Sequence, residues 1–200
     1  MCVAFAHGAQ RIIPVATPEE CLKFASEGFI CAAERDGKPV DGFNIGNSPF
    51  SYMVPEIQGA SIAITTTNGT HAIELSKKAG IVIIGSFLNK KAVCDFLIAQ
   101  QRDIVLLCSG WKNNYNLEDT LFAGALAQSL QNNFSIADDA TIGAIDLYDC
   151  AKEDLNTYIR KSSHAHRFEA LGILKDIEFC LQENIYEIVP VLKNDFLVLS

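Results

Sequence analysis

The segment Ser61-Ile62-Ala63-Ile64-Thr65-Thr66-Thr67-Asn68-Gly69-Thr70 decides how this sequence of 200 residues folds. Its first half, Ser61–Thr65, is a short apolar run of the kind that forms a buried strand. A turn of sequence Thr-Thr-Thr-Asn-Gly-Thr follows, and a helix is predicted from about Thr70 to Ala79. Strands that run through short turns into helices are typical of α/β proteins, so the segment predicts an α/β fold.

The same alternation continues on both sides of this segment. Further strands are predicted at Ile12–Ala16, Phe29–Ala33, Ile81–Ile84 and Ile104–Cys108. Further helices are predicted after Thr17, from about Asn89 to Gln100 and from about Leu117 to Leu130. Continuous apolar strands separated by helices predict a mostly parallel or mixed sheet that is covered on both faces.

The end of the sequence has a different pattern. It becomes helical after Asp138, and two last apolar runs, Glu187–Val191 and Phe196–Leu199, surround Lys193-Asn194-Asp195. This spacing predicts a C-terminal antiparallel hairpin. No internal repeat or low-complexity linker interrupts the sequence, so we expect a single domain over residues 1–200.

The charge balance restricts the class of partner. Acidic residues outnumber basic ones by 24 to 16, the net charge is -8, and no run of Lys or Arg occurs. This composition argues against nucleic acid and against an anionic membrane surface. No apolar run reaches the length of about 18 residues that a membrane span needs. A small anionic molecule stays compatible with the composition, because its site needs only a local positive field.

Seven cysteines are scattered along the sequence, and none forms a Cys-x-x-Cys pair. Most of them stand in apolar runs, which predicts buried, reduced thiols rather than a disulfide framework or a zinc site. No secretion signal is visible, so a cytoplasmic protein is expected. A homodimer is compatible with these properties.

Polar side chains follow the predicted strands where a ligand is expected. In an open parallel sheet, ligands bind beyond the carboxyl ends of the strands. The polar residues found after the strands include three carboxylates, one guanidinium, small hydroxyls and amides. They are Glu34, Arg35, the Thr65–Thr70 turn, Ser86, Asn89, Ser109, Glu118 and Asp119. We therefore expect one rim of the sheet to gather them.

The Thr65–Thr70 turn has the properties of a phosphate cradle. Gly69 allows a tight turn, the first backbone N–H groups of the helix point outward, and the helix dipole favours an anion there. The Thr hydroxyls add donors, and no P-loop Lys is present. The predicted phosphate-binding residues are Thr66, Thr67, Asn68, Gly69 and Thr70. The alternative is an ordinary helix cap, because Thr and Asn are common at helix starts.

The three carboxylates are candidate ligands of a hard cation. Mg²⁺ prefers oxygen ligands and leaves several positions to water and phosphate, so Glu34, Glu118 and Asp119 suit it. Each has a structural alternative. Glu118 and Asp119 are acids in a first helical turn, where they stabilise the dipole with Asn116 as the cap. Glu34 is next to Arg35, which is also typical of a surface ion pair.

Other candidate residues leave the interpretation open. His164 and His166 are two positions apart, so on one helix they do not share a face and do not predict a chelating pair. One of them is able to reach the site, and a surface histidine at a helix start is the alternative. Trp111 predicts either a pocket wall or burial against a helix. The motifs Cys-x5-Arg, Arg-His-Gly, GxSxG and HExxH are absent, so no familiar covalent mechanism is supported.

Several blocks of the sequence occur in an order and spacing that resemble one family. The blocks are Ala33-Glu34-Arg35-Asp36-Gly37, Gly42-Phe43-Asn44-Ile45-Gly46-Asn47-Ser48-Pro49, Thr65–Thr70, Gly85-Ser86-Phe87-Leu88-Asn89, Ser109-Gly110 with Glu118-Asp119, and Ser163-His164 with Leu171-Gly172, Asp176 and Cys180. The sequence resembles the 2-phosphosulfolactate phosphatase family, Mg²⁺-dependent acid phosphatases of coenzyme M biosynthesis. Two departures are Ala33, where the family has Gly, and Asn44, where an acid is common.

This resemblance implies a three-layer α/β/α fold and hydrolysis of phosphosulfolactate to sulfolactate and phosphate. Together with the residue patterns, it assigns catalysis to Glu34, Asp119 and Arg35, and Mg²⁺ to Glu34, Glu118 and Asp119. The expected substrate-binding residues are Asn47, Ser48, Ser86 and Ser109, and the expected partner is a small phosphate ester.

The resemblance leaves other outcomes open. Family members begin with a strand that ends in Asp-x-x-Arg, whereas Met1–Ala9 resembles the end of the helix after that strand. The chain is therefore expected to be shortened at its N-terminus relative to the family. One alternative function is non-catalytic binding of phosphate or another anion. Another is phosphatase activity on a different 2-phospho-carboxylate.

Overall fold

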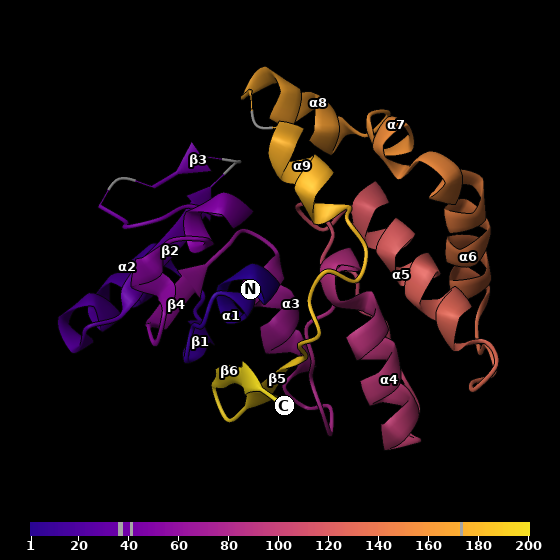
Figure 1. Ribbon diagram of the computed structural model, residues 1–200, viewed down its shortest axis with the longest axis horizontal. Coiled ribbons are helices and arrows are strands. Elements are labelled where there is room, and N and C mark those ends of the chain that lie inside the picture. Colours follow the sequence, from indigo (N-terminus) through magenta and orange to yellow (C-terminus); the bar gives the residue numbers. More distant parts are fainter. Residues whose placement is uncertain (36–37, 41, 173) are drawn as a thin grey trace. The chain divides into compact units, whose positions relative to one another are not determined.

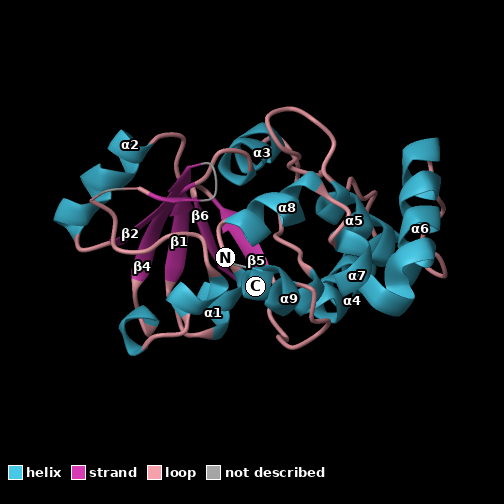
Figure 2. Ribbon diagram, turned by 90° about the horizontal axis from the view of Figure 1, so that it is seen from above, coloured by secondary structure: helices cyan, strands magenta, loops and turns pink. Residues whose placement is uncertain are grey.

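The computed structural model describes residues 1–35, 38–40, 42–172 and 174–200 (Figure 1). The chain divides into two compact units. The sheet unit consists of Met1–Gly85 and Ile188–Ser200, and the helical unit consists of Ser86–Glu187. Figure 2 shows that the labelled strands belong to the sheet unit.

The sheet unit contains a six-stranded mixed sheet in its described part. The strands are β1 (Arg11–Pro14), β2 (Ile30–Arg35), β3 (Lys38–Pro39), β4 (Ser61–Thr65), β5 (Pro190–Lys193) and β6 (Phe196–Leu199), in the order β3-β2-β4-β1-β6-β5. Strands β1, β4 and β2 are parallel, whereas β5 and β6 form an antiparallel hairpin. The predictions of an α/β fold and of a C-terminal hairpin are therefore confirmed, and the three-layer arrangement stays a prediction.

Strand β4 is central because it has a parallel neighbour on each side. Its Ile62 pairs with Ile12 of β1 and with Ile30 of β2. Three of its residues, Ile62, Ala63 and Thr65, are fully buried. Burial on both faces explains why this strand is a continuous apolar run rather than an alternating one.

Short helices accompany the strands of the sheet unit. They are α1 (Cys2–Ala6), α2 (Pro18–Lys23) and α3 (Gly69–Ser76), with the 3-10 helices η1 (Phe24–Glu27), η2 (Pro49–Tyr52) and η3 (Pro55–Ile57). Thr17 caps α2 by accepting the Glu20 N–H at 3.2 Å. Cys21 of α2 packs with Cys31 of β2 and Ala63 of β4 in one apolar cluster.

Two predicted strands were wrong. Residues 81–84 do not form a strand of the parallel sheet, since Ile83 makes an isolated antiparallel bridge with Val191. Residues 104–108 form no strand, and Val105 and Leu107 are 88% and 55% exposed. A strand requires a hydrogen-bonded neighbour, and among the described residues none pairs with this run. Apolar composition alone does not supply that neighbour.

The helical unit is held by packing between its longer helices. The elements are η4 (Phe87–Asn89), α4 (Lys90–Gln100), α5 (Leu117–Leu130), α6 (Asp139–Ala151), η5 (Lys152–Asp154), α7 (Leu155–Ile159), α8 (Ser163–Ala170) and α9 (Leu174–Cys180). A Cβ added to Gly124 of α5 would lie 2.0 Å from Ala144 O of α6. The two helices therefore approach closely at a residue without a side chain, around a core that includes Leu121 and Tyr148.

No helix in the described ranges is long and apolar enough to cross a membrane. The cysteines of the described ranges form no disulfide. Cys2, Cys21, Cys31 and Cys94 are buried, as the apolar runs predict. Cys108, Cys150 and Cys180 are exposed, so the expectation of buried thiols was wrong for these three.

Candidate active site

The carboxyl ends of β2 and β4 lie side by side in the sheet unit. Ala33 of β2 pairs with Thr65 of β4 in parallel register. The next residues, Glu34 and Thr66, are therefore neighbours along the same end of the sheet. Glu34 is partly buried, and its backbone pairs with Pro39 of β3. The structure thus brings Glu34 to the strand end at which the Thr65–Thr70 turn, called the Thr turn below, begins.

Arg35 is the last residue of β2, and its backbone pairs with Lys38. Its side chain lies outside the described part of the structure. The predicted catalytic role of Arg35 therefore stays a prediction.

The Thr turn closes through hydrogen bonds of its own side chains. Thr66 Oγ1 accepts the Thr70 N–H at 3.2 Å, and the Thr70 hydroxyl donates to Thr66 O at 3.1 Å. The buried Thr65 hydroxyl donates to Ala16 O at 3.3 Å, which ties the turn to the residues after β1. The hydroxyls of Thr65 and Thr70 thus stabilise the turn, and the predicted contact of Thr70 with phosphate stays a prediction.

Other donors of the turn lie at the start of α3. The N–H groups of Gly69 and His71 belong to the first turn of α3, where no intrahelical acceptor exists. Asn68 is the N-cap residue of α3, but its side chain makes no capping hydrogen bond. Thr67 Oγ1 is buried and has no hydrogen-bond partner among the described residues. An incoming anion would meet donors that the helix leaves unused.

Gly69 allows the turn because it has no side chain. Its backbone is not among the described glycines with positive φ, so the turn does not require a left-handed residue there. A Cβ at Gly69 would instead lie 3.3 Å from Thr66 Oγ1. The missing side chain gives the Thr66 hydroxyl room to reach Thr70.

The loop that carries Asn47 and Ser48 runs along β2. Ile45 forms a parallel bridge with Ala32, and Asn44 Oδ1 accepts the Cys31 N–H at 3.0 Å. The loop therefore proceeds in the same direction as β2 does toward Glu34. Asn47 is exposed and Ser48 is partly buried.

In the helical unit, Glu118 lies in the first turn of α5 with two unequal carboxylate oxygens. Its Oε1 lies 2.9 Å from His164 Nδ1 and accepts from Asn116 Nδ2 at 2.8 Å. Its Oε2 is buried and lacks a hydrogen-bond partner within the described residues. Asn116 is the N-cap residue by position, but its side chain binds Glu118 instead of capping the helix.

Asp119 is held by the loop that precedes α5. Its Oδ2 accepts the Gly110 N–H at 2.7 Å and the Ser109 hydroxyl at 3.3 Å. Gly110 has a φ of +68°, and a Cβ on it would lie 2.6 Å from Asn114 O. Only glycine fits this position without strain, so the loop depends on Gly110 for its hold on Asp119.

A tight turn follows Gly110. Trp111 and Asn114 form a two-way backbone bridge, with N–H···O distances of 3.0 and 2.9 Å. Between them, Lys112 and Asn113 have φ values of +51° and +61°, which is the pattern of a type I′ turn. The turn brings Trp111 edge-on to the His164 ring, with 6.5 Å between the ring centroids.

Ser86 starts η4 in a capping box with the buried Asn89. The Ser86 N–H and hydroxyl donate to Asn89 Oδ1 at 2.9 and 3.0 Å. This pair has a clear structural function, and the predicted contact of Ser86 with substrate stays a prediction.

The two neighbouring carboxyls have pKa shifts of opposite sign. Burial raises the pKa of Glu118, but the hydrogen bond and charge of His164, a backbone hydrogen bond and the Asn116 hydrogen bond together outweigh it, so the pKa lies below its ordinary value. Burial also raises the pKa of Asp119, and the charge of Glu118 adds to this effect. The Gly110 and Ser109 hydrogen bonds oppose the rise without cancelling it. A pair of adjacent acids with opposite shifts is common where acids have different chemical roles.

A comparison with known proteins assigns the family. The family model described as 2-phosphosulpholactate phosphatase matches residues 1–195. The chain belongs to the 2-phosphosulfolactate phosphatase family.

Curated relatives agree with this family. A protein of Thermotoga petrophila is 41% identical over 198 residues, which cover 98% of this chain and 85% of the relative. A protein of Caldanaerobacter subterraneus subsp. tengcongensis is 34% identical over 96% of this chain and 81% of its own. A protein of Clostridium acetobutylicum is 32% identical over 96% of this chain and 83% of its own length. All three are named "probable 2-phosphosulfolactate phosphatase".

Among the described acidic residues of this phosphatase-family chain, Glu118 has an oxygen that suits a hard cation. Glu118 Oε2 is a buried oxygen without a partner, in the part of the chain that is described, and it belongs to a carboxyl with a lowered pKa. No group of three or more His, Cys, Asp or Glu residues among those described is placed to hold a metal. A cation at Glu118 would therefore complete its coordination with water or substrate oxygens, as Mg²⁺ commonly does.

Sequence reasoning missed how Asn116 and His164 act. It treated Asn116 as a helix cap and gave a surface residue as the alternative for His164. Both side chains contact Glu118. His166 is exposed, in agreement with the expectation that the two histidines do not share a face. No pattern in the sequence indicates that Glu118 and His164, which are 46 positions apart, contact each other.

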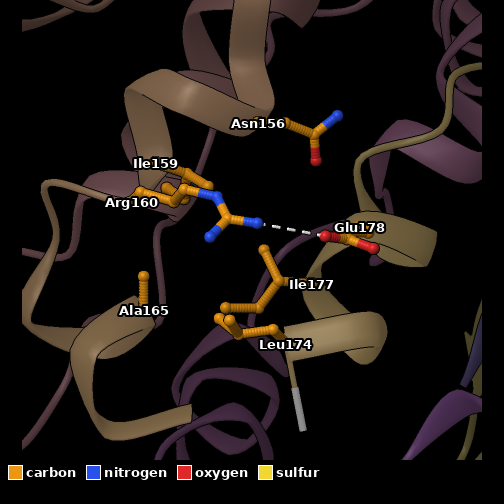
Figure 3. A pocket seen from close by; sticks show the side chains of 7 residues that line it. All are labelled: Asn156, Ile159, Arg160, Ala165, Leu174, Ile177 and Glu178. Carbon is orange, nitrogen blue, oxygen red and sulfur yellow. Dashed lines mark hydrogen bonds and ion pairs between the residues drawn. The ribbon is translucent and has the colours of Figure 1, made fainter. Parts of the chain in front are cut away.

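A small pocket in the helical unit is unrelated to the predicted residues. It lies between α7, α8 and α9, and its lining residues are Asn156, Ile159, Arg160, Ala165, Leu174, Ile177 and Glu178 (Figure 3). Arg160 and Glu178 form an ion pair of 3.2 Å across it. Both of these side chains are about half exposed, so the pair contributes little to stability.

Proposed function

We propose that this protein is a Mg²⁺-dependent phosphoric monoester hydrolase that converts phosphosulfolactate to sulfolactate and phosphate. The family match and the names of the relatives support the reaction. In the structure, the observation that carries the proposal is the buried, unpartnered Oε2 of the ionised Glu118. A buried carboxylate oxygen without a hydrogen-bond donor is costly, so Oε2 suits a positively charged partner in addition to His164 at Oε1.

The Thr turn is the proposed phosphoryl-binding element. The N–H groups of the first turn of α3 and the Thr67 hydroxyl are neutral donors, and the turn has no acidic residue to repel a phosphate. Asn47 and Ser48, of the loop beside β2, are proposed to contact the carboxylate or sulfonate of the substrate, and Arg35, Ser86 and Ser109 are further candidates for this role.

The proposed metal ligands in the helical unit are Glu118 and Asp119, and Glu34 of the sheet unit stays a separate candidate ligand. Mg²⁺, when bound, supplies Lewis acidity that polarises the phosphoryl group and offsets negative charge on the leaving oxygen. Glu118 contributes its Oε2. Asp119 keeps Oδ2 on Gly110 and Ser109, and this leaves Oδ1 to bind the cation or to accept a proton from the attacking water.

The direct test uses the full chain with Mg²⁺ and phospholactate-type esters, including phosphosulfolactate. Phosphate release should be measurable, and it should fall to background in Glu34→Ala and Asp119→Ala. Asp139→Asn is a matched control, because Asp139 is an exposed acid in the first turn of another helix, α6. Release by the native chain no faster than by the two alanine variants contradicts the enzymatic proposal.

The same assay separates the alternatives. Thermal stabilisation by phosphate without turnover, and without a need for Mg²⁺, would favour an anion-binding protein. Turnover of other phospho-carboxylates but not of phosphosulfolactate would favour a different substrate.

A place in coenzyme M biosynthesis and a cytoplasmic location belong to the same proposal. The seven cysteines without a disulfide in the described ranges support a reducing compartment. A homodimer is also proposed, and analytical ultracentrifugation tests it.

A further inference from the structure

The two carboxylate oxygens of Glu118 differ in their hydrogen-bond partners. Two side chains from different parts of the helical unit, Asn116 and His164, contact Oε1 at 2.8 and 2.9 Å. None of the described residues bonds to Oε2, although this atom is buried. The Glu118 side chain as a whole is 27% exposed. Oε2 is therefore buried because of the orientation of the carboxylate, not because the whole side chain lies deep in the core.

We propose that His164 is a positioning residue that turns Glu118 so that Oε2 receives the divalent cation. This inference rests on the proposed Mg²⁺-dependent function. Holding one oxygen from two directions fixes the plane of the carboxylate. The other oxygen then points to one place, and the coordination of a cation does not require the side chain to reorganise.

The surroundings of His164 fix its ring. Ser162 is buried, and its hydroxyl oxygen accepts the Ala165 N–H at 3.0 Å, which secures the first turn of α8. Trp111 packs edge-on against the ring from the loop before α5. His164 is therefore held by α8 on one side and by the Trp111 loop on the other, and only 23% of its side chain is exposed.

The histidine two positions later provides an internal control. His166 is on the same helix but is exposed, and it is not among the side chains that contact Glu118. If metal binding responded merely to a nearby imidazole or to the charge of α8, both histidines would contribute. Of the two histidines, only His164 is required for the proposed role.

The test is calorimetric titration of the full chain with MgCl₂ in the absence of substrate. His164→Ala should weaken Mg²⁺ binding by about 10- to 100-fold, the usual effect of losing a group that orients a metal ligand. His164→Asn keeps a donor near the position of Nδ1 and should recover part of the loss. His166→Ala should bind Mg²⁺ like the native chain.

His164→Phe decides the outcome if His164→Ala does not fold. It keeps a ring against Trp111 and removes the donor, so it should lose affinity to the same extent as alanine. Native affinity in His164→Phe or in His164→Ala overturns the inference, and so does a native chain that binds no Mg²⁺. If His164→Phe loses Mg²⁺ but the native chain releases no phosphate, the positioning role holds and the proposed function fails.

Discussion

The Thr turn of the sheet unit and the Glu118-Asp119 pair of the helical unit occupy the same kind of position but differ in charge. Each lies at the start of a helix, and each has one buried oxygen without a partner in the described structure. The first turn of α3 contains no acid, whereas the first turn of α5 contains Glu118 and Asp119. The positive end of α3 is thus available to an external anion, while that of α5 is balanced by its own carboxylates.

This difference teaches that a helix start does not define a ligand by itself. What matters is whether the first-turn side chains already supply the negative charge. The Thr turn offers donors and suits a phosphoryl group, and the acidic pair offers acceptors and suits a cation. Four experiments test this division of roles.

The largest effect is expected where the acceptor is removed from the acidic pair. Glu118→Gln replaces an anionic oxygen by a neutral one, and turnover should fall by about 100-fold or more because charge stabilisation at the reacting group is lost. Stabilisation of the protein by Mg²⁺ in thermal melts should disappear as well. The control Asp139→Asn should keep both. Undiminished turnover in Glu118→Gln would show that the acidic pair does not hold the cation.

A second experiment introduces a negative charge at the Thr turn. Asn68→Asp places a carboxylate at the N-cap of α3, where it should raise the stability of the protein by about 0.5 kcal/mol. The same charge should weaken phosphate binding by about 10-fold, through repulsion at short range. Urea denaturation and calorimetry measure the two effects. The exposed Asn133→Asp is the control for net charge, and phosphate affinity equal in both variants would contradict the cradle.

A third experiment separates the hydroxyl that is proposed to bind phosphate from a structural one. Thr67→Val removes a buried oxygen without a partner in the described residues, so stability should rise by about 1 kcal/mol while phosphate affinity falls. Thr70→Val removes the 3.1 Å bond to Thr66 O and should lower stability by about 1 kcal/mol. Stability changes of the same sign in the two variants would show that the two hydroxyls are equivalent.

The smallest effect concerns pH and the two neighbouring acids. The lowered pKa of Glu118 means that its contribution to stability is present above its ordinary pKa and is lost as pH falls through the lower folded value. The raised pKa of Asp119 has the opposite sign, so its contribution is lost as pH rises through the folded value.

Urea denaturation between about pH 3 and about pH 7 measures both contributions. The stability deficit of Glu118→Gln should shrink as pH falls. Asp119→Asn should gain stability relative to the native chain as pH rises. Parallel pH curves for the native chain and both variants would rule out opposite shifts.

Local patterns predicted much of the sheet unit. The apolar runs gave β1, β2, β4 and the hairpin, because each run finds a hydrogen-bonded neighbour. Residues 104–108 have the same composition but no described neighbour, and composition carries no information about pairing. The candidate site divides in the same way. The Thr turn was visible because its residues are contiguous, whereas the contact of His164 with Glu118 joins distant segments and left no local signal.

The pairing of Ile12 with Leu197 has a consequence for how the chain is made. Strand β1 is synthesised well before its neighbour β6, because the helical unit lies between them in sequence. The whole segment from β1 to β6 must be synthesised before this edge of β1 finds its partner. The helical unit, which is continuous in sequence, has no such delay. Until β6 is synthesised, the edge of β1 lacks this neighbour, and unpaired strand edges make incomplete chains prone to aggregation.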